Sequence, residues 1–250
     1  MSFIRLHRAL CGTVFLLTLV GCATTPVTKS PEDYFKEGEV LYQKKNYQEA
    51  IAQFKKVKES DSSADLTTKA ELKIADAHFA DKNYIEAAAA YEGFRKLHPN
   101  HEMAPYALYR LGLCYYNEIA GIDTDQTPVK NAVSAFENFL KQYPSSEHAA
   151  EVREKLTECI TKQVQHEIYV GRFYYRSEKY QAAIKRLEEC LVRYPTLPVM
   201  DEALLYLGKA YLESGDKVKG HEVLDRLAKE FPASKYLEEA GKFKRKYALK

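Results

Sequence analysis

The sequence predicts an all-α protein, a superhelix of five helical hairpins with a C-terminal capping helix. Two observations predict this fold. The composition is typical of helices, with much Ala, Glu, Lys and Leu, few Gly and Pro, and no Trp among 250 residues. Five consecutive segments also share one pattern, in which two helices are joined by a short turn.

The N-terminal segment predicts export and a lipid anchor. Residues 1–8 carry two Arg and no acid, and residues 9–20 are mostly apolar, which is the pattern of a secretory signal. The apolar run is shorter than the ~20 residues that a membrane span needs. It ends in Leu-Val-Gly-Cys22, which resembles the bacterial lipobox, so we expect a signal peptide over residues 1–21 and a covalent lipid on Cys22. The alternative is an ordinary secretory signal with an incidental cysteine.

Residues 22–30 are expected to form a short flexible tether behind this anchor. Acyl chains stabilise membrane attachment by about 0.8 kcal/mol per buried methylene, so a lipidated Cys22 holds a folded domain at a membrane. The residue after Cys22 is Ala23. In the lipoproteins that this signal resembles, Asp at that position favours retention in the inner membrane. Ala23 is therefore permissive for the cell outer membrane, where we expect the anchor, with the folded part facing the periplasm.

Small residues mark the two helices of each repeat. One recurs in the first helix, at Gly38, Ala75, Gly112, Gly171 and Gly208. Another recurs in the second helix, at Ala50, Ala87, Ala132, Ala183 and Gly220. We expect these residues to meet where the two helices cross closely, with large apolar residues such as Phe54 and Phe136 in the next layer. The pattern resembles the tetratricopeptide repeat, whose units cannot bury their own apolar stripe and so stack into a superhelix.

An irregular spacing divides the repeats into two blocks. The repeats are evenly spaced except between the third and the fourth, where extra residues lie in 118–129 and in the stretch after Ser145. That stretch has apolar residues at helical spacing, which predicts one connecting helix of about 30 residues. We expect repeats 1–3 in residues 31–144. The connecting helix, repeats 4–5 and a cap over 235–248 are expected in residues 145–250.

No motif in the sequence points to catalysis or to a metal site. Phosphate loops, dinucleotide fingerprints and nucleophile motifs are missing from it. The histidines lack metal-binding spacing, and the acidic stretch at 123–125 is followed by Pro128 where a calcium loop needs Gly. Cys114, Cys159 and Cys190 lack CxxC spacing and are expected to be buried apolar residues. We therefore predict a protein that is not an enzyme and has no metal or cofactor beyond its lipid anchor.

The charge balance gives no reason to expect a nucleic-acid partner. Two of the 37 Lys and Arg residues, Arg5 and Arg8, belong to the signal, which leaves 35 bases against 35 Asp and Glu. A neutral chain lacks the excess of bases that binds phosphate backbones or anionic lipid surfaces. We expect that the chain does not bind nucleic acid.

The first helices of repeats 1–3 carry two rows of large apolar side chains. One row is Phe35, Leu72 and Tyr109, and the other is Tyr42, Phe79 and Tyr116. The rows are two helical turns apart and so share a face of each helix. In the repeat family this face lines the concave surface, so we expect a groove for an extended peptide with aromatic side chains. The alternative is that these rings only pack between neighbouring repeats.

Taken together, the lipobox, the three-plus-two repeats, the insertion and the connecting helix resemble the BamD family, lipoproteins of the outer-membrane β-barrel assembly (BAM) complex. The resemblance implies a non-catalytic scaffold that helps fold and insert outer membrane proteins. It implies that the N-terminal repeats bind C-terminal segments of unfolded outer membrane proteins. It also implies that the C-terminal repeats dock on the POTRA domains of the insertase BamA, and that other BAM lipoproteins bind.

Two arginines are candidates for the docking of the insertase. Arg186 lies where the family has an Arg that pairs with a partner carboxylate. Arg176, in the preceding helix, is a second candidate. The alternative is that both are ordinary solvated charges.

Two other functions stay open at this point. A repeat lipoprotein can serve another envelope machine, such as a pilus or secretin pilot or a Tol-Pal associate. A cell-wall enzyme can use such repeats as an accessory domain, but no stretch outside the repeats is long enough for a catalytic domain. The assembly scaffold is the function that we favour.

Overall fold

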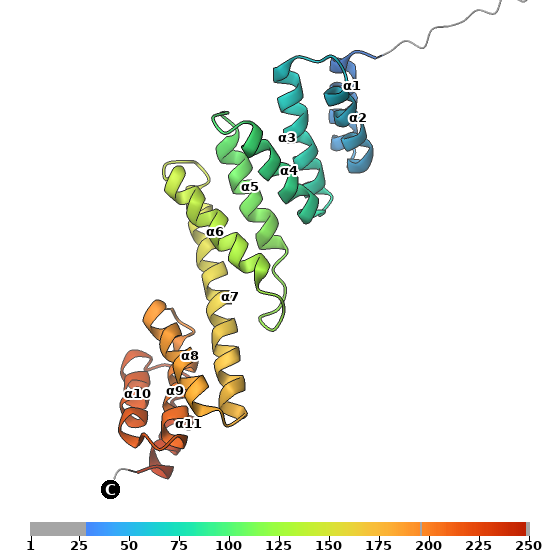
Figure 1. Ribbon diagram of the computed structural model, residues 1–250. Helices are drawn as coiled ribbons and strands as arrows, with labels where there is room; N and C mark the ends of the chain where they lie inside the picture. Colours follow the sequence, from blue (N-terminus) through green and yellow to red (C-terminus); the bar gives the residue numbers. More distant parts are fainter. Residues whose placement is uncertain (1–28, 196, 249–250) are drawn as a thin grey trace, which may run out of the picture.

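The computed structural model describes residues 29–195 and 197–248. Cys22, the signal peptide and most of the expected tether lie outside these residues. The described residues form eleven helices: α1 (Pro31–Gln43), α2 (Tyr47–Glu59), α3 (Ala64–Ala80), α4 (Tyr84–Leu97), α5 (Ala104–Asn117), α6 (Thr127–Gln142), α7 (Ala149–Arg176), α8 (Tyr180–Arg193), α9 (Met200–Glu213), α10 (Lys217–Glu230) and α11 (Leu237–Lys246). They follow one another in an elongated, curved stack from α1 to α11 (Figure 1).

Each helix packs mainly on its neighbours in the chain, which is the arrangement of stacked hairpins. The hairpins are α1–α2, α3–α4, α5–α6, α7–α8 and α9–α10, and α11 packs on α9 and α10. The prediction of an all-α fold with five hairpins and a capping helix is confirmed. The cap is shorter than the predicted 235–248, because residues 235 and 236 still belong to the turn before α11.

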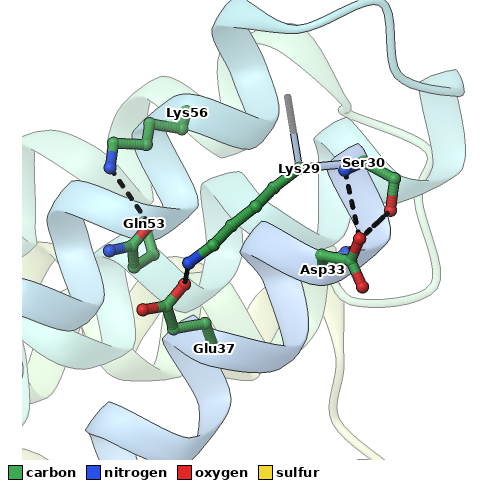
Figure 2. Close-up of polar contacts among 6 residues, drawn as sticks. All are labelled: Lys29, Ser30, Asp33, Glu37, Gln53 and Lys56. Carbon is green, nitrogen blue, oxygen red and sulfur yellow. Dashed lines mark hydrogen bonds and ion pairs between the residues drawn. The ribbon is translucent and has the colours of Figure 1, made fainter. Parts of the chain in front are cut away.

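Local chemistry sets the point where the first repeat begins. The Ser30 hydroxyl oxygen accepts the Asp33 backbone N–H at 3.1 Å. The Asp33 carboxylate accepts the Ser30 backbone N–H at 3.1 Å (Figure 2). This reciprocal cap satisfies two donors at the start of α1. Pro31 occupies the first turn, where its missing donor costs nothing. Lys29 also forms an ion pair with Glu37, two turns along α1 (Figure 2).

At the close crossing within a hairpin, the glycine of the first helix faces a large residue of the second helix. In repeat 3, a Cβ on Gly112 would lie only 2.4 Å from the ring of Phe136, which is fully buried. The glycine therefore makes room for the large residue of the second helix, and repeat 1 has the same arrangement. In repeat 5 the two small residues also approach each other, because a Cβ on Gly208 would lie 3.3 Å from the carbonyl oxygen of Gly220.

Three apolar clusters follow one another along the stack, and α7 takes part in two of them. The first cluster lies between α1, α2 and α3. The second joins repeats 2 and 3 to the N-terminal part of α7, as far as Cys159. The third begins at Val164 on α7 and reaches α11. Because α7 is one helix of 28 residues, close to the predicted length, it connects the two blocks without a loop.

The insertion at 118–129 also contacts α7. The Ile122 carbonyl oxygen lies 2.5 Å from Nδ1 of His166. Ile122 lines a cavity of about 410 Å³ whose other walls come from α7, from the start of α9 and the residues before it, and from the residues before α11. The insertion of repeat 3 therefore reaches the C-terminal block.

Candidate functional site

Two of the predicted groove residues line a cavity on the N-terminal repeats. Phe35 on α1 and Leu72 on α3 face a cavity of about 340 Å³. Phe94 and Met103, from α4 and the turn before α5, extend its apolar wall. Polar and charged side chains form the remaining lining, namely Glu39, Asp65, Thr68, Lys69, Lys73, His101 and Glu102. An apolar cavity with a charged rim is suited to bind one large side chain of an extended peptide.

Tyr42 and Phe79, the second row of repeats 1 and 2, lie two turns further along the same helices. The Tyr42 ring packs edge-on against Tyr47, with centroids 5.4 Å apart, and the Phe79 ring packs edge-on against Tyr84 at 5.3 Å. Each ring is thus held by the first residue of the second helix of its own repeat. Both rings remain partly exposed. Burial, with the Asp76 carboxylate nearby, raises the pKa of Tyr42, so its hydroxyl remains a hydrogen-bond donor at neutral pH.

Arg110 on α5 belongs to this surface, although the sequence pattern did not single it out. Its guanidinium carbon lies 3.6 Å from the centroid of the Phe79 ring. Its Nε donates to the Tyr91 hydroxyl oxygen at 3.1 Å. Tyr91 and Tyr106 in turn donate to Oδ1 of Asp76, at 2.5 and 2.9 Å. Burial, and then the Asp76 charge, raise the pKa of both phenols, so they stay protonated and orient the carboxylate.

The two predicted groove residues of repeat 3 pack against the long helix. Tyr109 is only 8% exposed and donates its hydroxyl to Oε2 of Glu151 at 2.8 Å. Burial, with this hydrogen bond, raises the pKa of Tyr109 to about 12. Tyr116 donates to Glu158, and Nζ of Lys155 donates to the Tyr116 oxygen at 3.3 Å. Both hydroxyls therefore have partners on α7, whereas the ring of Tyr116 stays partly exposed, as those of Tyr42 and Phe79 do.

The two docking candidates lie on one hairpin of the C-terminal block. Arg186 on α8 pairs with Glu167 of α7, with Nη1 2.8 Å from Oε2. The Arg186 side chain is 40% exposed and borders two cavities of about 120 and 330 Å³. Arg176 is the last residue of α7 and is exposed. The arginines therefore lie on a surface that a partner can reach.

The cysteines of the described residues are chemically quiet. Cys114, Cys159 and Cys190 are buried free thiols, as predicted, and burial raises the pKa of each to about 12, 12 and 11. Thiols with such pKa values are protonated at neutral pH and are poor nucleophiles. Residues 29–195 and 197–248 hold no group of three His, Cys, Asp or Glu placed to bind a metal ion. No helix in this part of the chain has the length and apolar character needed to cross a bilayer.

The fold and this surface define a class of protein: a helical-repeat protein of the tetratricopeptide type with an aromatic face on its N-terminal repeats. The family model YfiO, described as an outer membrane lipoprotein, matches residues 27–223. The chain belongs to this family of outer membrane lipoproteins. This match confirms the prediction that the chain is an outer membrane lipoprotein.

The curated relatives agree with the family match. The chain is 28% identical over 243 residues to the outer membrane protein assembly factor BamD of Neisseria meningitidis serogroup A, covering 90% of this chain and 91% of the relative. It is 29% identical over 213 residues to the BamD of Rickettsia prowazekii, covering 85% of each chain. These matches confirm the BamD resemblance, and with it membership of a family that is not enzymatic.

Solved structures match the chain at low sequence identity. The chain is similar to the TPR2AB domain of yeast Sti1 in its complex with pHSP90, with a TM-score of 0.44 and 13% identity. The match covers 88% of this chain and 98% of that one.

Proposed function

We propose that this protein is a non-catalytic scaffold of the BAM complex that helps fold and insert outer membrane proteins. The family match over residues 27–223, together with BamD relatives that align over most of the chain, carries this proposal. A lipid on Cys22 holds the chain at the periplasmic side of the outer membrane. The repeats then present one surface to substrates and another to the insertase.

The aromatic face of repeats 1 and 2 binds C-terminal segments of unfolded outer membrane proteins. Strands of membrane barrels alternate apolar and polar residues, so an extended segment presents an apolar side chain at every second position. The cavity beside Phe35 and Leu72 accepts one of these side chains. Tyr42 and Phe79 offer flat ring surfaces to another, about 10 Å further along the helices.

Peptide binding tests this groove. Phe35→Ala combined with Tyr42→Ala should weaken the binding of a fluorescent ten-residue peptide that ends in Phe by about tenfold or more, because buried aromatic contacts dominate such interfaces. Ile85→Ala is the matched control, since Ile85 is 70% exposed on α4 and lies outside the rows. Unchanged affinity in the double variant, with wild-type helicity by circular dichroism, would contradict the groove.

The α7–α8 hairpin docks on the POTRA domains of BamA. Arg186 is 40% exposed and pairs through Nη1 with Glu167, so other guanidinium donors stay available for a partner carboxylate. Arg176 adds a second positive charge on the same hairpin. Replacing Arg186 with Glu removes the guanidinium donor and repels the partner's carboxylate. Replacing Glu167 with Gln removes only the internal ion pair and leaves the Arg186 guanidinium present.

Copurification with BamA tests this docking surface. Arg186→Glu should lose BamA, and the control Glu167→Gln should retain it. Retention of BamA by Arg186→Glu would place the contact elsewhere. Crosslinking in the cell envelope should recover BamA and other BAM lipoproteins with the wild-type chain, and recovery of a secretin without BamA would favour a pilot function instead.

A further inference from the structure

We propose that the C-terminal block contains a second site for a large apolar side chain of an unfolded outer membrane protein, and that one rim charge makes the two sites select segments of opposite charge. This inference rests on the proposed function and adds a site outside the predicted groove. Three features of the described residues support it: the shared construction of two cavities, the apolar lining of the second cavity, and the opposite charges on their rims.

The cavity of about 410 Å³ between α7, α9 and α11, here the C-terminal cavity, is the counterpart of the cavity of about 340 Å³ in repeats 1 and 2, here the N-terminal cavity. The register follows from Gly38 and Gly171, the small residues of repeats 1 and 4. Residues at equal spacing from these glycines line both cavities: Phe35 and Ile168, Glu39 and Arg172, and Met103 and Tyr236. The turn before α11 therefore takes the place that the turn before α5 has in the N-terminal cavity.

The lining of the C-terminal cavity suits one large apolar side chain. Ile168, Val199 and Tyr236 contribute apolar surface from three separate elements. Ile122 adds an apolar residue from the insertion of repeat 3. Tyr169 also lines the cavity and is 36% exposed, so its ring is accessible from solvent. An apolar side chain that enters this cavity leaves water, which is the main driving force for such binding.

The C-terminal cavity differs from the groove of repeats 1 and 2 in what lies beside it. By the same register, the counterparts of Tyr42 and Phe79 are Tyr175 and Leu212. Leu212 is only 1% exposed, and Nζ of Lys209 lies 4.8 Å from the centroid of the Tyr175 ring. The second site therefore lacks a pair of exposed rings. It holds a single side chain and binds a segment more weakly than the groove does.

One rim charge of the N-terminal cavity is left without an ionic partner. Lys69 pairs with Asp65 at 2.7 Å. Lys73 pairs with Glu39 at 3.5 Å. Glu102 is exposed, and among residues 29–195 and 197–248 no basic nitrogen lies within 4.0 Å of its carboxylate. A basic residue beside the bound apolar side chain therefore finds a free carboxylate at this rim.

The C-terminal cavity carries the opposite charge at the equivalent position. Arg172 pairs with Glu202 at 2.9 Å, and the Asp201 carboxylate accepts the Ser234 hydroxyl at 2.7 Å. Lys235, the counterpart of Glu102, is exposed and forms neither an ion pair nor a hydrogen bond with the residues that the structure describes. An acidic residue beside the bound side chain therefore finds a free ammonium group here.

Photocrosslinking on the unaltered protein tests the second site. The full mature chain in detergent is irradiated with ten-residue peptides that carry one central p-benzoylphenylalanine, flanked by Lys in one peptide and by Glu in the other. Mass spectrometry then maps the crosslinked positions. We expect crosslinks at the lining of both cavities. The ratio of the yields at the two cavities should change at least about threefold between the peptides, because one exposed charge pair has a modest effect on binding.

The possible results separate this inference from the proposed function. Crosslinks at the N-terminal cavity alone, with both peptides, would overturn the second site and leave the groove of repeats 1 and 2 intact. The same ratio of yields with both peptides would overturn the charge selection. Missing crosslinks at the N-terminal cavity would contradict the proposed groove itself.

Exchanging the rim charges assigns the selection to single residues. Lys235→Glu should lower the yield of the Glu peptide at the C-terminal cavity about threefold and leave the N-terminal cavity unchanged. Glu102→Lys should have the corresponding effect on the Lys peptide at the N-terminal cavity. Lys229→Glu is the matched control, because Lys229 is exposed on α10 and lies outside the cavity lining, and it should keep the wild-type yields. Unchanged yields in both exchange variants would overturn the role of the rim charges.

A variant of the cavity wall tests the apolar contact apart from the charge. Tyr169→Ala should lower the yield of both peptides at the C-terminal cavity by about fivefold or more, because apolar contact with the bound side chain is lost. Its yields at the N-terminal cavity should stay at the wild-type level. Wild-type yields at both cavities, in a variant whose helicity by circular dichroism is unchanged, would overturn the second site.

Discussion

A methyl group at Gly112 is a direct test of how the hairpins pack. The Cβ of Gly112→Ala would lie 2.4 and 2.6 Å from two carbons of the Phe136 ring. Carbon atoms in contact are about 3.5–4.0 Å apart, so the ring has to retreat by more than about 1 Å. Phe136 has no exposed surface and lies inside the second cluster, so there is little room for this movement. Such overpacking costs about 1–3 kcal/mol.

The expected net effect includes the helix propensity of the new residue. Ala is favoured over Gly in a helix interior by about 0.8–1 kcal/mol. With an overlap this severe we take the upper end of the packing cost, which gives a net destabilisation of about 2 kcal/mol. Gly93→Ala is the control, because a Cβ on Gly93 has no neighbour within 4 Å, and it should stabilise the chain by about 0.8–1 kcal/mol.

Urea unfolding followed by far-ultraviolet circular dichroism measures both variants. We expect the unfolding midpoint to fall for Gly112→Ala and to rise for Gly93→Ala, relative to the wild-type chain. A midpoint for Gly112→Ala at or above the wild-type value, with Gly93→Ala stabilised, would refute the reasoning. It would mean that the Phe136 ring moves aside at no cost and that glycine is not needed at the crossing.

The remaining predictions concern the anchor, a partly buried histidine and a helix turn. Cys22→Ser should move the protein from the membrane to the soluble fraction with unchanged helicity, and full membrane retention would contradict the lipobox. Burial lowers the pKa of His78, and Nδ1 of its ring has no partner. The folded state therefore favours the neutral ring, so the free energy of unfolding decreases as the pH falls below about 6.5. His78→Leu should therefore flatten the dependence of the urea midpoint on pH between about pH 7.5 and 5.5, and an unchanged slope would exclude this ring as its source. Glu178 has a φ of 56° in the turn after α7, so Glu178→Gly should raise the stability by about 0.5–1 kcal/mol, whereas Gly215→Ala, at φ 95° in the equivalent turn, should lower it, both measured by thermal unfolding.

Much of the fold could be predicted from the sequence because its determinants are local. Each hairpin is indicated by helical periodicity, by a small residue in each of its helices and by a recurring Pro. These signals do not depend on how the hairpins stack. Ser30 and Pro31 mark the start of α1 through bonds within one helical turn. The lipobox is likewise a contiguous motif that is recognised without a fold. For the same reason the length of the long helix was predicted closely from its apolar spacing alone.

The candidate site depended on contacts between residues that are distant in the sequence. Tyr109 and Tyr116 share a face with the other groove residues, but the angle at which α7 packs on α5 places Glu151 and Glu158, each 42 residues away, against their hydroxyls. The helical spacing of apolar residues identifies the buried face of a helix, but it does not tell which neighbouring helix covers that face. Arg110 was missed because its partners belong to other helices, and a charged residue in an apolar pattern resembles an ordinary solvated charge.

The sequence by itself therefore determined which elements form, their order along the chain, and that the chain carries a lipoprotein signal. The tertiary structure decided which of these aromatic residues stay exposed, which pack against α7, and that Arg110 lies beside Phe79. The physical reason is that helix formation and capping depend on atoms within a few residues, whereas exposure and electrostatic pairing depend on how whole repeats stack.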